Sequence, residues 1–356
     1  MTKGQSPAHF VAGVRAGDRR VIAKTITLLE SRRPDHRDLG QEVLDALMAE
    51  TGRGMRVGIS GPPGVGKSTF IETLGLSLLA RGHRLAVLAI DPSSPVSGGS
   101  ILGDKTRMER LAREPRAYIR PTPSGGTLGG VAHRTREAML VCEAAGFDVV
   151  IVETVGVGQS EFEVRSMVDL FAVLLQPGAG DELQGIKKGI LELADLLVVN
   201  KADGEQRAAA DRTRVEHTHA LSLLAPAASG WTTQVMCASA LNGAGIAQFW
   251  ELVLAHQQAL ANNGELVRRR RVQARAWLWR LLDDGLEAAF RADTRVAARL
   301  GDLETEVEAS GVSAPRAARL LLDLFTRKRA SHYARARCQR APGADTEVDS
   351  LPVPET

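Results

Sequence analysis

Six short apolar runs between residues 55 and 240 constrain the fold of this 356-residue chain more than any other feature. Most of their positions are apolar in succession, which is typical of strands that are covered on both faces. Helical patterns separate the runs, and strands joined by helices form right-handed crossovers in a mostly parallel sheet. The predicted fold class is therefore α/β. The runs are MRVGIS, RLAVLAID, FDVVIVET, LFAVLLQ, DLLVVN and TQVMCASA.

The chain on both sides of this region is expected to be helical. Residues 5–50 carry apolar side chains at helical spacing, and Pro34 divides them into two expected helices, because proline disfavours helix at the preceding residue. Beyond residue 260 the segment ARAWLWRLLDDGLEAAF has a single apolar stripe, and a second helix is expected over about 315–335. The stripe consists of Leu278, Leu281, Leu282, Leu286 and Phe290.

These patterns predict four parts of the chain. The first is a helical N-terminal arm and the second an α/β domain. The third is a helical C-terminal region, and the last is a polar, proline-containing tail that is expected to be disordered. Their expected bounds are 1–52, 53–260, 261–340 and 341–356.

Bulk properties exclude several classes of protein. The formal net charge of +3 is too small to indicate a nucleic-acid-binding protein. Cys142, Cys237 and Cys338 are far apart, which favours reduced thiols over a disulfide or zinc framework. No apolar run approaches the roughly 20 residues of a membrane span, and the N-terminus lacks the apolar segment of a secretory signal. The expectation is a cytoplasmic protein with no nucleic-acid or membrane partner.

The segment GISGPPGVGKST carries a phosphate-binding motif between a predicted strand and a predicted helix. It fits G-x-x-x-x-G-K-[ST], in which backbone N–H groups and the helix N-terminus converge on phosphates. Lys67 is expected to reach the β and γ phosphates, and Ser68 to ligate Mg²⁺. A glycine-rich turn without a ligand is the alternative, which the flanking strand and helix disfavour. The expected nucleotide contacts are Gly61, Pro62, Pro63, Gly64, Val65, Gly66, Lys67, Ser68 and Thr69.

A second motif, N-K-x-D in VVNKAD, predicts guanine as the base. The Asp203 carboxylate can accept from N1–H and from the exocyclic amine of guanine, whereas adenine would leave it unpaired. The Lys201 stem can lie over the base. A solvated strand end is the alternative explanation of such a short motif, but the order of the motif and its distance from the phosphate loop favour GTP over ATP. The expected base contacts are Asn200, Lys201, Asp203, Ser239, Ala240 and Leu241.

Three carboxylates are candidates for a magnesium site with Ser68. Asp91 and Glu153 end predicted strands at the edge where open α/β sheets bind ligands, and Asp104 ends the Ser-, Gly- and Pro-rich loop after Asp91. Hard oxygen ligands are what Mg²⁺ prefers. Asp104, just before KTRMERLA, would serve equally well as a helix N-cap.

The strand ending at Glu153 continues into a glycine loop that bears on hydrolysis. In Ras-like GTPases a glutamine directly after the glycine of this loop orients the attacking water. Here Gly156 is followed by Val157, and Gln159 is two residues displaced. The sequence therefore predicts slow intrinsic hydrolysis that depends on a partner or a rearrangement.

Together these segments resemble the MeaB/MMAA-type GTPases, once labelled ArgK or LAO/AO transport kinases, a metallochaperone-related branch of the P-loop GTPases. The resemblance covers about residues 10–330. It rests on GPPGVGKST, AIDPSS, GDKTRM, ETVGVGQSE, QPGAGDELQGIKKGILE and NKAD.

The resemblance implies a GTP-dependent chaperone of an adenosylcobalamin-dependent acyl-CoA mutase, typically methylmalonyl-CoA mutase, and a homodimer formed through C-terminal helices. GTP or GDP and Mg²⁺ are the implied cofactors. Residues 177–188 match a third switch loop that answers the mutase, with Lys187 a sensitive position. From the residues alone, this segment is better explained as an ordinary strand–helix connection. The expected catalytic residues are Lys67, Asp91, Glu153 and Lys187.

Two other functions compete with this reading. A nickel-inserting GTPase would carry a His-rich tract, whereas the eight histidines here are scattered. A kinase of a periplasmic amino-acid transport system would need a phospho-acceptor site beyond the nucleotide pocket. The basic stretch VRRRRVQAR, residues 267–275, is interpreted as a solvated helix face or a dimer-contact patch rather than a nucleic-acid site.

Overall fold

The computed structural model of the protein comprises two compact units, Met1–Trp277 and Leu278–Thr356. The first unit contains a β-sheet with helices around it, and the second is helical. The structure describes residues 6–31, 33–91, 108–123, 128–154, 160–178, 193–223 and 230–338. The predicted tail, 341–356, lies outside these ranges.

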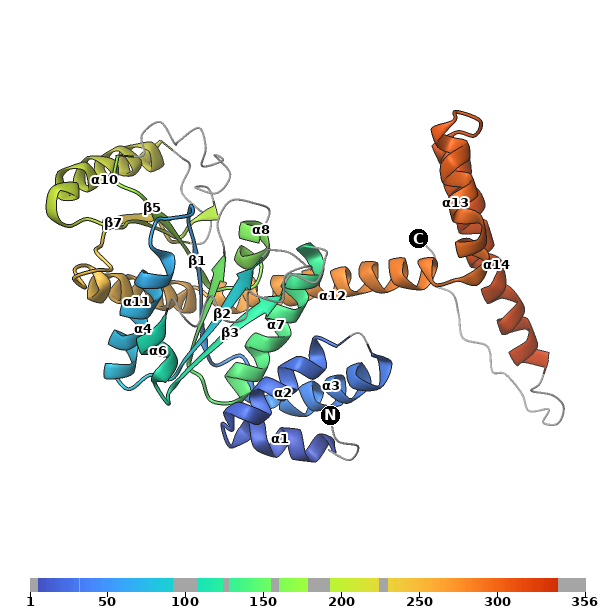
Figure 1. Cartoon of the computed structure of the whole chain (residues 1–356), viewed down its shortest axis with the longest axis horizontal. Coiled ribbons are helices and arrows are strands. Elements are labelled where there is room, and N and C mark those ends of the chain that lie inside the picture. The colour runs from blue at the N-terminus through green and yellow to red at the C-terminus, as the bar shows by residue number, and fades with distance from the viewer. Residues whose placement is uncertain are drawn as a thin grey trace, which may run out of the picture. The chain divides into compact units, whose positions relative to one another are not determined.

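Seven strands form one sheet in the first unit, in the order β3-β2-β4-β1-β5-β6-β7. Figure 1 shows this sheet with helices around it. Every pair of neighbouring strands is parallel. The predicted α/β class with a parallel sheet is therefore confirmed. The strands are β1 Met55–Ser60, β2 Leu85–Asp91, β3 Ala117–Pro123, β4 Val149–Thr154, β5 Leu170–Leu175, β6 Leu196–Val199 and β7 Gln234–Cys237.

Strand β3 is the one strand that the apolar runs did not predict. Its sequence, AYIRPTP, is interrupted by Arg120, Pro121 and Pro123. Proline has no N–H for a ladder hydrogen bond and is confined to sheet edges. β3 is an edge strand, paired only with β2, so its prolines are tolerated there.

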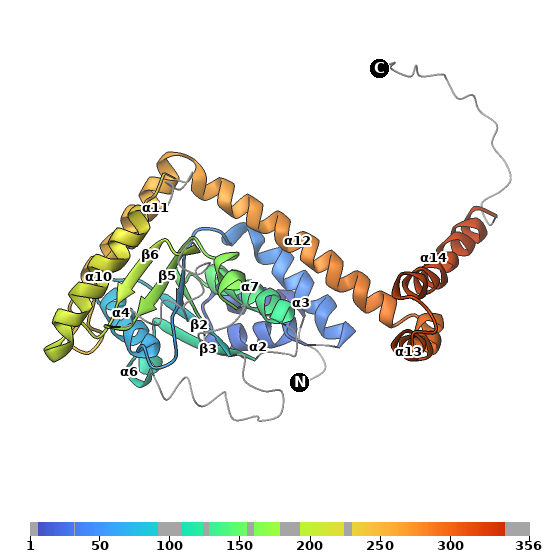
Figure 2. The same ribbon diagram turned by 90° about the horizontal axis from the view of Figure 1, so that it is seen from above.

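Both faces of the sheet are buried, which explains the consecutive apolar positions. In β4, Val149 and Ile151 belong to the hydrophobic cluster that includes residues of α4, α6 and α11. Val150 and Val152 alternate with them and belong to the cluster formed with α1, α2, α3 and α7. Figure 2 shows α4 and α6 on one side of the sheet and α2, α3 and α7 on the other.

The helices of the first unit begin and end as follows. They are α1 Pro7–Arg15, α2 Arg19–Leu29, α3 Pro34–Leu47, α4 Lys67–Ala80, α6 Glu109–Arg113, α7 Leu128–Ala144, α8 Ser160–Arg165, α10 Arg207–Ser222 and α11 Ile246–Asn262, with 3₁₀ turns η1 Met48–Glu50 and η3 Gly204–Gln206. α12, Glu265–Arg291, begins in the first unit and ends in the second. In the described part of the chain, none of the helices has the length and apolarity needed to cross a membrane.

The N-terminal segment forms three helices rather than the two expected. The additional break lies at Gly17, where φ is +71°, and at Asp18. The Asp18 carboxylate accepts hydrogen bonds from the N–H groups of Arg20 and Val21, at 2.8 and 3.2 Å, and so caps α2. The apolar periodicity continues across this cap, which hid the break from a pattern-based prediction.

These helices share the hydrophobic core of the sheet rather than forming a core of their own. Phe10, Ile22 and Leu47 are fully buried and lie in the same cluster as residues of α7 and β4. At the edge of this contact Arg120 of β3 forms a largely buried ion pair with Glu30. The N-terminal helices are thus part of the first compact unit, while the predicted boundary near residue 52 stays a prediction.

The first turns of α12 are fastened to the amino-terminal edge of the sheet. Asp169, immediately before β5, accepts two hydrogen bonds from Arg270, at 2.8 and 2.6 Å. It also accepts one from the backbone N–H of Arg56, at 3.0 Å. Arg270 further donates to the carbonyl of Gly54, at 2.7 Å. α12 is therefore joined to the starts of both β1 and β5.

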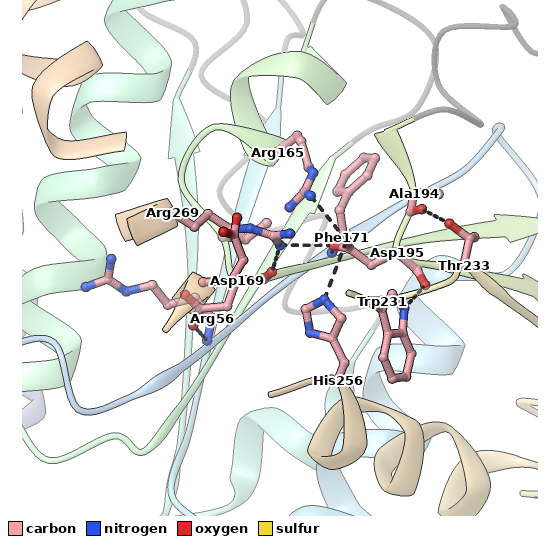
Figure 3. A network of polar contacts seen from close by, with 12 residues as sticks. Arg56, Arg165, Asp169, Phe171, Ala194, Asp195, Trp231, Thr233, His256 and Arg269 are labelled. Carbon is pink, nitrogen blue, oxygen red and sulfur yellow. Dashed lines mark hydrogen bonds and ion pairs between the residues drawn. The ribbon is translucent and has the colours of Figure 1, made fainter. Parts of the chain in front are cut away.

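A second carboxylate, Asp195 before β6, extends this network (Figure 3). It accepts from the Phe171 N–H at 2.9 Å and from Arg165 at 3.1 Å. Arg269 and His256 each lie 3.5 Å from its oxygens. Burial alone would raise the pKa of Asp195, but these neighbours outweigh it and lower the pKa. The carboxylate therefore remains charged inside the protein.

α12 also contacts α7. Trp277 donates through Nε1 to Nδ1 of His133 at 2.9 Å, and Arg136 donates to the carbonyl of Gln273 at 2.8 Å. The Arg136 guanidinium lies 5.3 Å from the Trp277 ring centroid. We call Arg269, Arg270, Gln273 and Trp277 the α12 clamp.

The clamp corrects one interpretation of the sequence. Within residues 267–275, Arg269 and Arg270 are not part of a solvated helix face, because they pair with carboxylates within the same unit. A dimer contact through the other residues of this stretch stays a prediction. Arg268 is exposed and, among the residues that the structure describes, its ion-pair partner is Glu265 on its own helix. Sequence alone could not distinguish these arginines. Arg268 pairs with Glu265, three residues away, whereas the partner of Arg270 is Asp169, 101 residues away in the sequence.

The second unit is built from the end of α12, α13 Thr294–Glu308 and α14 Ala314–Cys338. α13 and α14 bury Val296, Leu303, Ala317 and Leu321 between them. The sequence patterns predicted a helical region here but did not identify α13 as a separate helix. Asp293 caps its first turn by accepting from the N–H groups of residues 295 and 296. Apolar side chains exposed along α12 in this unit are Leu278, Trp279, Leu281, Leu282 and Leu286.

Candidate nucleotide-binding site

The phosphate-binding motif forms the turn between β1 and α4, as predicted. Gly61 has φ +150°, and a Cβ there would lie 2.6 Å from the carbonyl oxygen of Leu174. Gly66 has φ +94°, and a Cβ there would lie 2.8 Å from the Asn200 side-chain nitrogen. Both positions therefore need glycine for space as well as for backbone conformation.

The Lys67 ammonium lies back over this turn. It donates to the carbonyls of Gly61 at 2.6 Å and Pro62 at 3.1 Å, and the residue is only 8% exposed. α4 begins at Lys67 with no side-chain cap, so its first N–H groups are available to an anion. The turn thus has the donors that a phosphate group requires.

Ser68 and Glu153 lie together at the carboxyl edge of the sheet. The Ser68 hydroxyl donates to Oε1 of Glu153 at 3.1 Å, and Glu153 is 7% exposed. β1 and β4 are adjacent, which brings the turn after β1 and the end of β4 together. Thr154 donates to Ser60 at 2.8 Å and ties the same two strands. A serine hydroxyl and a carboxylate are hard oxygen ligands that fit Mg²⁺.

The predicted base residues come together from the loops after β6 and β7. Asn200 donates through Nδ2 to the carbonyl of Val65 at 2.8 Å, and its Oδ1 accepts from the Ala240 N–H at 3.1 Å. The Asp203 carboxylate accepts a short hydrogen bond from the Ser239 hydroxyl. Lys201 adopts φ +60°, a left-handed conformation that is uncommon for a side-chain-bearing residue. The phosphate turn and the base loops are therefore hydrogen-bonded to each other.

Comparison with known proteins identifies the family. Residues 22–295 match the family model described as methylmalonyl Co-A mutase-associated GTPase MeaB. The chain belongs to the MeaB family. It is 50% identical to the GTPase ArgK of Escherichia coli over 271 residues, 76% of this chain and 82% of that protein. It is 45% identical to the mitochondrial methylmalonic aciduria type A homolog of Mus musculus over 327 residues, 89% of this chain and 79% of that protein.

A solved structure agrees with this membership of the MeaB family. The crystal structure of a LAO/AO transport system kinase superposes with a TM-score of 0.72 at 37% identity. The match covers 91% of this chain and 99% of that one. The predicted resemblance to MeaB/MMAA-type GTPases and the predicted P-loop GTPase fold are therefore confirmed.

Several predicted residues of this MeaB-family chain lie outside the described residues. They are Asp104, Gly156, Val157, Gln159 and Lys187, with most of the loop 177–188. Asp91 is described only in its backbone, as the last residue of β2. Because Ile90 pairs with Thr154 across the ladder, Asp91 ends its strand at the same edge as Glu153.

Sequence reasoning missed one residue that touches the site. Thr73, in the second turn of α4, donates to the carbonyl of Ala240 at 2.8 Å. It belongs to none of the motifs and lies 167 residues from its partner, so no local signal could have identified it.

Proposed function

We propose that this chain is a GTPase that gates cofactor loading and protects or reactivates an adenosylcobalamin-dependent acyl-CoA mutase of the methylmalonyl-CoA type. The observation that carries the proposal is the closed arrangement of Asn200 between Val65 and Ala240, with Asp203 held by Ser239. Such an arrangement suits guanine, because the fixed carboxylate can accept from two donors that adenine lacks. Membership of the MeaB family, whose description names methylmalonyl Co-A mutase, supports the mutase as client.

In this proposal the phosphates of GTP replace the carbonyls that Lys67 now contacts. Lys67 binds the β and γ phosphates, and the uncapped start of α4 donates its N–H groups. The ammonium is already within the turn, so only its partners change. Lys187 in the third loop is the proposed residue that answers the mutase.

Magnesium is the proposed metal of this site. Ser68 and Glu153 would hold it, with Asp91 and Asp104 as further candidate ligands. When bound, Mg²⁺ neutralises charge that develops on the β and γ phosphate oxygens. Glu153 extends one methylene further from its strand than aspartate would, which suits contact with the metal through water. Since Val157 stands where Ras-like GTPases have glutamine, we propose slow hydrolysis until the mutase binds.

The deciding experiment measures phosphate release from GTP and ATP by the full-length protein, with and without an acyl-CoA mutase. We expect release from GTP only, slow for the isolated protein and faster with mutase. Asp203→Asn should weaken GDP binding about 100-fold and favour xanthosine diphosphate, because an amide donates where the carboxylate accepted. Equal use of ATP and GTP by the wild-type protein would overturn the guanine assignment.

A kinase is a second candidate function, because the solved structure with a TM-score of 0.72 is titled a transport system kinase. Incubation with γ-labelled GTP and candidate acceptor proteins separates the two. Stable label on a protein would favour the kinase. Label found only as free phosphate would favour the GTPase.

A further inference from the structure

The carbonyl of Ala240 is held by a residue of the phosphate-binding helix. Thr73 Oγ1 lies 2.8 Å from this oxygen and 3.0 Å from the carbonyl oxygen of Thr69, one turn earlier in α4. A hydroxyl has one proton to donate, and the shorter contact is to Ala240. Thr73 is the one side chain that donates to the Ala240 carbonyl in the described structure.

This contact closes a ring of hydrogen bonds around the base loops. Val65 accepts from Asn200, and Asn200 accepts from the Ala240 N–H, at 2.8 and 3.1 Å. Thr73 donates to the carbonyl of Ala240. Thr73 belongs to α4, which begins at Lys67, directly after the turn that contains Val65. Both polar groups of Ala240 are thus tied to the phosphate turn or its helix.

The hydrogen bond to the Ala240 carbonyl also sets the orientation of the next N–H group, that of Leu241. The peptide group is planar and trans, so its C=O and N–H point in opposite directions. Fixing the Ala240 carbonyl on α4 therefore aims the Leu241 N–H away from α4. Ser239 N–H donates to Ala244 and Ala240 N–H to Asn200, whereas Leu241 N–H has no hydrogen bond within the described part of the chain. Leu241 is 84% exposed as a residue, and its N–H lies in the loop after β7 that the sequence predicts to face the base.

We propose that Thr73 is a positioning residue for guanine recognition, which aims the Leu241 N–H at O6 of the base. The inference rests on the proposed guanine site and adds a determinant from the phosphate-binding helix. In this proposal the first turn of α4 binds the phosphates, and Thr73 in its second turn orients the loop that contacts the base.

The test compares binding of GDP and 6-thio-GDP, which has sulfur, a weak acceptor, in place of O6 but keeps the donors that face Asp203. The proteins are the full-length wild type, Thr73→Val and Thr73→Ser. The matched control is Thr218→Val, because Thr218 is a helical threonine whose hydroxyl donates to the carbonyl of Arg214 in its own helix, at 2.8 Å. Thermal unfolding checks that each variant is folded, and Thr73→Ala replaces Thr73→Val if the latter is not.

We expect the wild type to bind GDP more tightly than 6-thio-GDP. Thr73→Val should reduce this ratio about fivefold or more, mainly through weaker GDP binding. Thr73→Ser and Thr218→Val should keep the ratio within about twofold. An unchanged ratio in Thr73→Val, or equal losses for both nucleotides, would overturn the role of Thr73. Wild-type protein without preference for GDP over ADP would instead overturn the guanine site itself.

Discussion

At the scale of single residues, we expect the negative charge of Glu153 to be needed for Mg²⁺-dependent hydrolysis. Its carboxylate accepts from Ser68 at 3.1 Å, and a glutamine could still accept that hydrogen bond through its amide oxygen. Glu153→Gln should therefore leave Mg²⁺-free GDP binding within about twofold while slowing Mg²⁺-dependent GTP hydrolysis about 100-fold. Parallel titrations of nucleotide affinity and phosphate release at several Mg²⁺ concentrations test this. Equal losses of affinity and rate would mean that Glu153 is a structural residue.

Residues of the site differ in how well sequence could predict them. Asn200 and Asp203 sit in a spaced motif whose chemistry dictates the residue types. The structure joins Asn200 to the phosphate turn and Asp203 to Ser239 in the loop after β7. Thr73 could not be predicted, because a helical threonine commonly donates to its own helix and only the fold provides Ala240 as a second acceptor. Gly66 was assigned by motif, but its steric reason, the Asn200 amide, appears only in three dimensions.

At the scale of elements, the α12 clamp should contribute substantially to stability. Arg270→Ala leaves the buried Asp169 carboxylate without its bidentate partner, which should cost about 3 kcal/mol in free energy of unfolding. Urea denaturation measures this value. Arg268→Ala is the matched control, since Arg268 is 66% exposed and pairs within its own helix, and it should cost less than about 0.5 kcal/mol. Equal effects of the two variants would contradict the clamp.

The contact of α7 with the N-terminal helices should depend on pH through Glu137. Burial raises the pKa of Glu137 to about 7, from 4.5, although Arg134 and Arg37 oppose the rise. Between these values the unfolded chain loses its proton first, so the contribution of Glu137 to stability declines as pH rises from about 4.5 to 7. Glu137→Gln should therefore match the wild type at pH 4.5 and exceed it by about 1–3 kcal/mol at pH 8.

Denaturation at several pH values checks this, with Glu42→Gln on the exposed face of α3 as control. A stability difference between Glu137→Gln and wild type that does not change with pH would contradict the prediction. The difference in free energy of unfolding between Glu137→Gln and Glu42→Gln separates the effect of Glu137 from that of the other titrating groups.

Elements were predictable where burial imposes a pattern and less so elsewhere. Six of the seven strands appear as apolar runs, because both of their faces are covered. β3 escaped because an edge strand admits prolines and an arginine. α13 lies in the region expected to be helical but was not identified as a separate helix, and its buried residues are Val296 and Leu303. The break at Gly17 depended on a cap that periodicity does not report.

At the scale of the whole molecule, we expect the predicted homodimer to bury the exposed apolar side chains of α12 beyond Trp277. Leu278, Leu282 and Leu286 are 55%, 44% and 51% exposed in the single chain. Leu286→Glu should shift a wild-type dimer towards monomer, because a second copy would have to bury the new charge. Light scattering after size-exclusion chromatography at several concentrations measures the mass. Val215→Glu, at a 56% exposed site on α10, should leave it unchanged. A monomeric wild type would contradict the prediction.

Strand β6 has only four residues, Leu196–Val199, and both of its neighbours in the chain are anchored. Asp195 before it joins the ion pairs around Arg165, and Asn200 after it joins the phosphate turn to the base loop. Because side chains alternate between the faces of a sheet, one inserted or deleted residue would turn one anchor to the wrong face. Surface loops of this chain can change length during evolution, but the segment from Asp195 to Asn200 should keep a constant number of residues among functional descendants.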